Sequence, residues 1–190
     1  MKEGLLAAGL LILLAGCTGA EPSGAAAQPS DAAASSTPAA GPHGHTTVGC
    51  AESRPLENGD SPASDDLVFG PLRYPGLAHG YPGPTIPPQE DGVLFAKIGT
   101  ELMPDATVTV SVASVARSWA GIRTEGEPSA GYSSVTYVSC ATSQSPDGVW
   151  WVGGFTLSDR TSGCVPVEIR IGAEESIQRA VIAFWVESCV

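Results

Sequence analysis

The sequence predicts an all-β fold, an antiparallel β-sandwich of about eight short strands stapled by disulfides. Apolar and polar residues alternate with a period of two in several segments, most clearly in TVTVSV at 107–112. Gly, Pro, Asp and Ser clusters separate these segments, and only 172–178 has helical character, for one turn at most. An immunoglobulin-like or jelly-roll-like arrangement fits this pattern, and a barrel is the alternative.

Residues 1–16 predict a secretory signal peptide. Lys2 precedes an apolar run from Leu5 to Leu14, which is too short to span a bilayer of about 30 Å. The tetrad Leu14-Ala15-Gly16-Cys17 resembles the lipobox of bacterial lipoproteins, in which diacylglycerol alkylates the cysteine thiol and the chain is cut just before it. The resemblance implies a lipid anchor at Cys17 that holds the mature protein on the outer face of the cell membrane.

Residues 17–47 predict a disordered tether. After Cys17 they are mainly Ala, Pro, Ser, Gly and Thr, with no Val, Ile, Leu, Met or aromatic residue. Such a segment buries too little apolar surface to offset the entropy of ordering. His43 and His45 lie in it and are interpreted as solvated linker residues, so we expect no metal site there. The folded domain is expected over 48–190.

We expect eight strands in this domain. They are 67–72, 92–98, 107–114, 118–123, 134–140, 149–157, 165–171 and 179–187. VPVEIRI at 165–171 alternates like 107–112, which predicts that Pro166 lies at a sheet edge or a strand start. The last run, AVIAFWVES at 180–188, is apolar on both faces and predicts a central strand with one face under a loop.

Four cysteines remain beside Cys17, an even set that predicts two disulfides in an exported chain. They are Cys50, Cys140, Cys164 and Cys189, for which three connectivities exist. Cys140 and Cys164 flank one predicted strand with its turns, which favours their pairing and leaves Cys50 for Cys189. Zinc is the competing use, but no C-x-x-C spacing occurs.

The composition excludes several function classes. The net charge of −11 disfavours nucleic acid and anionic lipid as partners. Beyond His43 and His45 the chain has only His79, so few histidines are available for a Ser-His-Asp or Cys-His catalytic centre. No cofactor-binding motif is present in the sequence. The acidic pairs Asp65-Asp66 and Glu174-Glu175 would suit a hydrolase only if two acids converged in a cleft, and turn or surface solvation explains them more simply.

Two features are candidates for binding. The segment 74–91 has five prolines after Tyr74, which predicts a stiff, extended loop that displays Tyr74, His79 and Tyr81. Trp150 and Trp151 are neighbours on a predicted strand and must point to opposite faces, so at least one ring is expected at the surface. The alternative for the loop is a mobile excursion without a binding role, and the alternative for the two tryptophans is ordinary core packing.

The strand motifs resemble an uncharacterised family of secreted domains from high-GC Gram-positive bacteria. The resemblance rests on FGPLRY at 69–74, ATVTVSV at 106–112, VTYVSC at 135–140, GGFTL at 153–157 and CVPVEIRI at 164–171. It implies a fold and no reaction, and it supports pairing Cys140 with Cys164. We therefore expect a non-catalytic envelope lipoprotein that displays its sandwich to a protein or glycan partner. The alternatives are a carboxylate-based hydrolase and a metal-handling lipoprotein that uses His43, His45 and His79.

Overall fold

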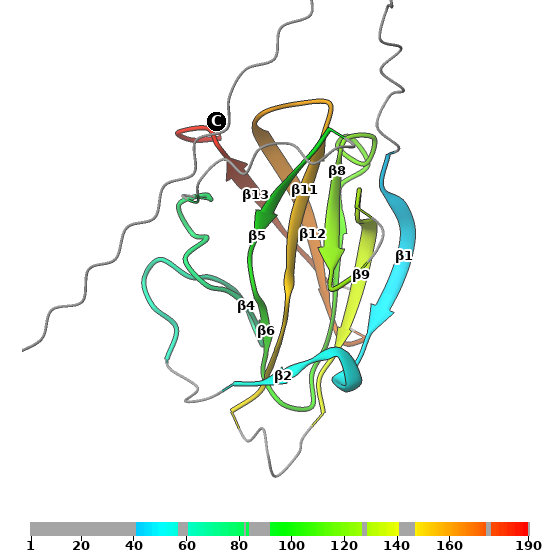
Figure 1. Ribbon diagram of the computed structural model, residues 1–190. Helices are drawn as coiled ribbons and strands as arrows, with labels where there is room; N and C mark the ends of the chain where they lie inside the picture. Colours follow the sequence, from blue (N-terminus) through cyan, green and yellow to red (C-terminus); the bar gives the residue numbers. More distant parts are fainter. Residues whose placement is uncertain are drawn as a thin grey trace, which may run out of the picture. The chain divides into compact units, whose positions relative to one another are not determined.

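The computed structural model describes residues 41–56, 61–81, 83, 92–126, 129–140, 147–173 and 176–189 (Figure 1). All of them belong to one compact unit, Thr37–Val190. The predicted signal peptide, Cys17 and the first part of the predicted tether lie outside these residues. Within the described ranges, no helix is both long enough and apolar enough to cross a membrane.

Sheet A has eight strands. Seven follow the order β13-β12-β7-β9-β8-β11-β5, and β1 pairs with β9. The bounds are β1 His43–Val48, β5 Val93–Lys97, β7 Thr107–Val112, β8 Ala120–Thr124, β9 Tyr132–Val138, β11 Gly153–Ser158, β12 Gly163–Ile171 and β13 Ile177–Phe184. The predicted alternation in β7 is confirmed, because Val108, Val110 and Val112 are fully buried while Thr107 is exposed.

Sheet B has five short strands in the order β2-β10-β6-β4-β3. The bounds are β2 Arg54–Pro55, β3 Leu67–Phe69, β4 Leu72–Tyr74, β6 Thr100–Leu102 and β10 Val149–Trp151. A single 3-10 turn, η1 (Cys50–Glu52), connects β1 to β2. Every pair of named strands in the two sheets is antiparallel except β1 with β9.

The two sheets pack face to face over one apolar core, which confirms the predicted β-sandwich. The rings of Tyr74 in β4 and Phe155 in β11 lie 5.7 Å apart between centroids, and those of Tyr137 in β9 and Trp151 in β10 lie 5.3 Å apart. The Thr100 hydroxyl donates to the Tyr137 hydroxyl oxygen across the same interface at 3.4 Å. Alternate residues of both sheets therefore fill one shared interior.

Each predicted strand segment contains strand, but two of the eight are broken. Segment 67–72 turns at Gly70, whose φ of 54° lies in the left-handed region, and it yields β3 and the start of β4. Segment 149–157 divides into β10, in sheet B, and β11, in sheet A. The strands β1, β2 and β6 were not predicted, and Ile177 and Gln178, expected in a helical turn, begin β13.

The predicted tether boundary at residue 47 is wrong, because His43–Val48 form β1 (Figure 1). β1 lies parallel to β9, with His43 opposite Tyr132 and Val48 opposite Tyr137. Only Val48 of the strand is buried. A polar strand of low apolar content is ordered here because an adjacent strand edge supplies its backbone hydrogen bonds.

The cysteines form two disulfides as predicted, but the predicted pairing is wrong. Cys50 pairs with Cys140 and Cys164 with Cys189, with Cα atoms 6.0 Å and 5.8 Å apart. Cys50 follows β1 and Cys140 follows β9, so their disulfide joins the ends of two adjacent parallel strands. Cys164 is the second residue of β12, and Cys189 follows β13, the strand that forms a hairpin with β12. Strand adjacency, and not proximity along the chain, selects both pairs.

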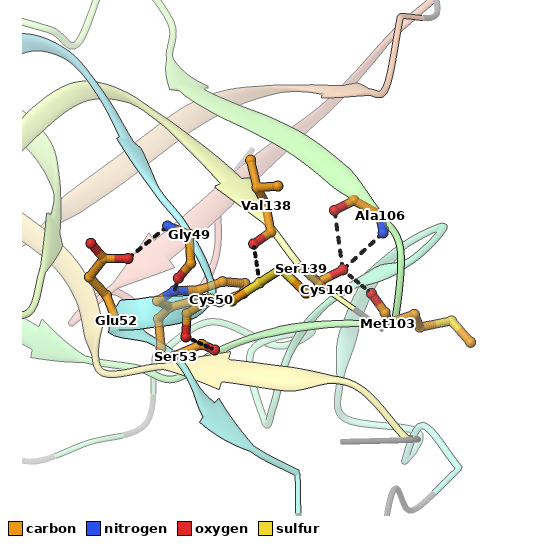
Figure 2. The surroundings of a disulfide bond; sticks show 10 residues. Gly49, Cys50, Glu52, Ser53, Met103, Ala106, Val138, Ser139 and Cys140 are labelled. Carbon is orange, nitrogen blue, oxygen red and sulfur yellow. Dashed lines mark hydrogen bonds between the residues drawn. A yellow bond between two sulfur atoms is a disulfide. The ribbon is translucent and has the colours of Figure 1, made fainter. Parts of the chain in front are cut away.

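Polar contacts surround the first disulfide (Figure 2). The Gly49 amide donates to the Glu52 carboxylate at 3.0 Å, and the Ser53 hydroxyl donates to the Cys50 carbonyl oxygen at 2.9 Å. Beside Cys140, the Ser139 hydroxyl donates to the Met103 carbonyl oxygen at 2.5 Å. The turn after β1 and the end of β9 are therefore fixed by hydrogen bonds as well as by the covalent link.

The predicted central position of the last strand is wrong, since β13 ends the strand order of sheet A. Val181, 56% exposed, lies on its open face. The predicted covering loop is present: the Tyr81 amide donates to the Ala183 carbonyl oxygen at 2.7 Å. The predicted edge or start position of Pro166 is wrong, because it is the fourth residue of β12, a strand that lies between β13 and β7. Residue pairing with β7 begins only at the next residue, Val167.

Candidate binding face

One cross-strand row of side chains marks the outer face of sheet B. Arg54 in β2 pairs with Trp150 in β10, which pairs with Glu101 in β6. Glu101 pairs with Arg73 in β4, and Arg73 with Val68 in β3. In each three-residue strand the flanking residues face the core, so the middle residue points outward. We call these five residues the Trp150 row.

Arg73 holds the middle of the row through two carboxylates. Its guanidinium Nε donates to Glu101, and its Nη1 lies 3.5 Å from Asp66 Oδ2. The three side chains are only 17%, 16% and 7% exposed, so the ion pairs are largely shielded from water. Removing one partner would leave a poorly solvated charge, which fixes the geometry of the row.

Asp66 stays ionised in this setting. Burial raises its pKa, but backbone N–H donors from Gly76 and Ala63 and the charge of Arg73 together lower the pKa below its usual value. The Gly76 and Ala63 donors lie 2.9 Å from its two carboxylate oxygens. Asp66 therefore connects the segments before β3 and after β4 to the ion pairs.

Trp150 lies half-buried between a glycine and an arginine. A Cβ at Gly99 would be 3.6 Å from the indole Cε3 atom, so the ring lies against the backbone there. The Arg54 guanidinium carbon is 5.2 Å from the ring centroid, a cation–π contact. Arg54 also forms an ion pair with Glu125 at 3.1 Å. Both side chains are about half exposed, so this ion pair holds Arg54 only weakly over the Trp150 ring.

A depression of 360 Å³ lies beside the row. Its lining combines apolar and proline residues with one ion pair and two further polar residues, and includes Leu56, Ser61, Pro62, Val68, Pro71, Arg73, Glu101, Met103, Pro104 and Asp147. Val68 is 41% exposed and Met103 is 59% exposed. A second hollow of 730 Å³ lies beside Trp150 and shares Leu56 and Glu101 with the first, so the two adjoin. Exposed apolar side chains that gather at a preformed hollow are typical of binding surfaces.

Two of the five predicted binding residues prove to be core residues. Tyr74 is 1% exposed and Trp151 is 2% exposed. The Trp151 indole N–H donates to the Gly49 carbonyl oxygen at 3.0 Å. Burial raises the pKa of Tyr137, its ring neighbour, to about 12, and raises that of Tyr74 well above its usual value, with Tyr137 as the second cause.

The other three predicted residues lie at or near the surface but in different places. Trp150 belongs to the row described above. Tyr81 packs against Phe184 and Trp185, with ring centroids 6.1 Å and 5.5 Å apart, and is only half-exposed. His79 is exposed on the turn before it. The predicted recognition loop is thus partly docked on β13, and residues 82 and 84–91 lie outside the described residues.

The partners of Trp150 in the row were missed by the sequence interpretation. Arg54, Arg73 and Glu101 are single polar residues in strands of two or three residues. The alternation Leu72-Arg73-Tyr74 and Thr100-Glu101-Leu102 was a usable signal, because a lone charge between two apolar or small residues marks an outward position. Their convergence depends on the strand order, which no local pattern contains.

The acidic pairs considered for a hydrolase do not converge in a cleft among the described residues. Asp66 is hydrogen-bonded and ion-paired, and Asp65 is exposed, while Glu174 and Glu175 lie outside the described residues. No cluster of three or more His, Cys, Asp or Glu side chains suited to a metal occurs among the described residues. In comparisons with known proteins, no family model, no curated protein and no solved structure matches the chain.

Proposed function

We propose that the chain is a non-catalytic cell-envelope lipoprotein that presents a β-sandwich to a protein or glycan partner through the outer face of sheet B. The observation that carries this proposal is the union of the Trp150 row with an apolar depression that exposes Val68 and Met103. The buried ion pairs of Arg73 fix the floor of this surface before any partner arrives, which lowers the entropic cost of binding.

The anchor part of the proposal rests on the sequence around Cys17, which resembles a lipobox. Two disulfides in the folded part support an oxidising, extracytoplasmic location, because cytosolic thiols are kept reduced. The resemblance to secreted domains of high-GC Gram-positive bacteria agrees with it. In this proposal the segment before β1 separates the sandwich from the membrane.

A protein partner fits the depression better than a glycan does. The lining residues Leu56, Val68 and Met103 offer aliphatic contacts. Arg73 and Glu101 are already paired with each other. A sugar is held mainly by hydrogen bonds to free polar groups, with an aromatic ring stacked on it. Trp150 supplies a ring, so a glycan is the second outcome of the test below.

The hydrolase alternative has little support at this face, because Asp66 and Glu101 are ion-paired with Arg73 and Asp147, which also lines the depression, is exposed. A general acid needs a carboxyl whose pKa is raised, whereas Asp66 has a lowered pKa. Glu101 is ion-paired with the Arg73 guanidinium, so its carboxylate is already engaged. These observations support a binding module.

The experiment is capture from solubilised envelope with the full-length tagged chain, wild type and variants. Met103→Glu places a charge in the depression, and Val181→Glu is its matched control, because Met103, just after β6, is 59% exposed and Val181, in β13, is 56% exposed. We expect one defined partner to be lost with Met103→Glu and with Trp150→Ala but kept with Val181→Glu. Capture that is equal for all variants, or lost only with Val181→Glu, would refute the assignment of this face. Retention that depends on a wall polysaccharide would identify a glycan.

A further inference from the structure

The chain has only three histidines, and β1 places two of them on one exposed face. His43 and His45 are both exposed, and they lie opposite Tyr132 and Ser134 in the parallel ladder with β9. Residues two apart on a strand point to the same side, and Gly44 between them has no side chain. The two imidazoles therefore stand side by side on the outer surface of sheet A.

Their spacing suits a shared metal ion. Two residues of strand advance the chain by about 6.6 Å, and a bridging ion needs bonds of about 2.0 to 2.1 Å to each imidazole nitrogen. The length of two imidazole side chains covers this span from neighbouring Cβ positions. Imidazole is a preferred ligand of divalent copper, nickel and zinc.

The backbone beneath the two histidines is already ordered. The His43 amide donates to the Gly131 carbonyl oxygen at 2.9 Å, and the Ser133 hydroxyl donates to the Gly44 carbonyl oxygen at 3.1 Å. The sequence interpretation rejected a metal site because ordering a flexible tether would oppose binding. In a formed strand, only the ring rotamers need to be fixed.

The His45 ring is free to reorient and has hydroxyl groups beside it. Its Nδ1 lies 3.4 Å from the Ser134 hydroxyl oxygen, and its Nε2 lies 3.4 Å from that of Thr47. Both contacts are long, so a rotation that brings one nitrogen to the side of His43 costs little. Ser134 is itself hydrogen-bonded to Ser111 at 2.8 Å. Its hydroxyl is therefore held in place to hydrogen-bond the His45 ring nitrogen that does not bind the metal.

We propose that His43 and His45 form a two-histidine site for a divalent first-row metal ion, with Cu²⁺ bound most tightly and water in the remaining positions. The net charge of −11 favours the approach of a cation. His79 does not belong to this site. It precedes the segment docked on β13, and β12, β7 and β9 separate β13 from β1, a path of roughly 19 Å along the sheet at about 4.8 Å per strand.

The test is Cu²⁺ titration of the full chain by calorimetry and electron paramagnetic resonance. All proteins carry Cys17→Ser, because Cys17 is the one cysteine outside the two disulfides and its thiol would compete for copper. The pair variants are His43→Thr and His45→Thr, which keep a good strand former in β1. His79→Thr is the matched control, an exposed histidine outside the strand.

We expect one equivalent of Cu²⁺ with nitrogen coupling in the spectrum, and at least tenfold weaker binding in either pair variant. The control should bind like the parent. Equal thermal unfolding midpoints for the parent and the pair variants would exclude loss of fold as the cause. No copper binding by the parent, unchanged binding in the pair variants, or an equal loss with His79→Thr would overturn the proposal.

Discussion

Removing the Cys50–Cys140 disulfide should destabilise the domain more than removing Cys164–Cys189. The two bonds close loops with sequence separations of 90 and 25 residues. The chain-entropy model assigns them about 4.6 and about 3.5 kcal/mol at 25 °C, because the longer loop restricts the unfolded chain more. The first bond also fixes the turn that offers the Gly49 carbonyl oxygen to the Trp151 indole N–H. The loop entropy and this hydrogen bond therefore both make the loss of Cys50–Cys140 the more destabilising one.

The assay is urea unfolding followed by tryptophan fluorescence and far-ultraviolet circular dichroism. Cys50→Ser/Cys140→Ser is compared with Cys164→Ser/Cys189→Ser, and free energies are taken only where both probes coincide. We expect the first double variant to lose about 1 kcal/mol more than the second. A larger loss in the second variant would refute the reasoning. A peptide map that links Cys140 to Cys164 would refute the strand order on which it rests.

Three further predictions concern the core and the binding face. The two buried tyrosines should contribute a constant amount to the unfolding free energy below about pH 10, and above it the free energy should fall by about 1.4 kcal/mol per pH unit for each of them, because Tyr74 and Tyr137 stay neutral when folded but ionise when unfolded. Tyr137→Phe should roughly halve this slope in urea titrations up to pH 12, and an unchanged slope would refute the burial of Tyr137. Gly154→Ala should cost about 3 kcal/mol or more in the same assay, because the Gly154 φ is 150° and the new Cβ would lie 1.9 Å from the Ala96 carbonyl oxygen in β5; an unchanged midpoint would refute the close approach. Trp151→Ala should lower the unfolding free energy by about 3 to 5 kcal/mol, and Trp150→Ala by less than half of that, because only Trp151 is buried. Only Trp150→Ala should reduce partner capture. A larger loss of stability in Trp150→Ala would mean that Trp150, and not Trp151, faces the core.

Strand cores were predictable because their residues carry the signal locally. In β7 and β12, valine and isoleucine alternate with polar residues, and burial follows that alternation. β1 was not predictable in the same way, because HGHTTV is polar and becomes a strand only along the edge of β9. β2 has only two residues and shows no period, and the three residues of β6 show a single alternation that was too short to predict a strand.

The disulfide pairing and the binding face depend on strand order, which is a non-local property. Cys50 and Cys140 are far apart in sequence and meet only because β1 lies beside β9. The sequence correctly implied that Trp150 and Trp151 face opposite ways, but not which ring is buried. Tyr74 and Tyr81 each begin a Tyr-Pro-Gly tripeptide. Tyr74 nevertheless ends a strand of sheet B and packs in the core, whereas Tyr81 packs on β13.

Photo-crosslinking in intact cells tests the central claim most directly. A photoreactive amino acid replaces Met103 in one strain and Val181 in the other; the two positions are similarly exposed, the first just after β6 of sheet B and the second in β13 of sheet A. If the outer face of sheet B binds a protein partner, illumination should give one discrete adduct from position 103 and none from position 181. A discrete adduct from 181 alone, or none from either position, would contradict the account.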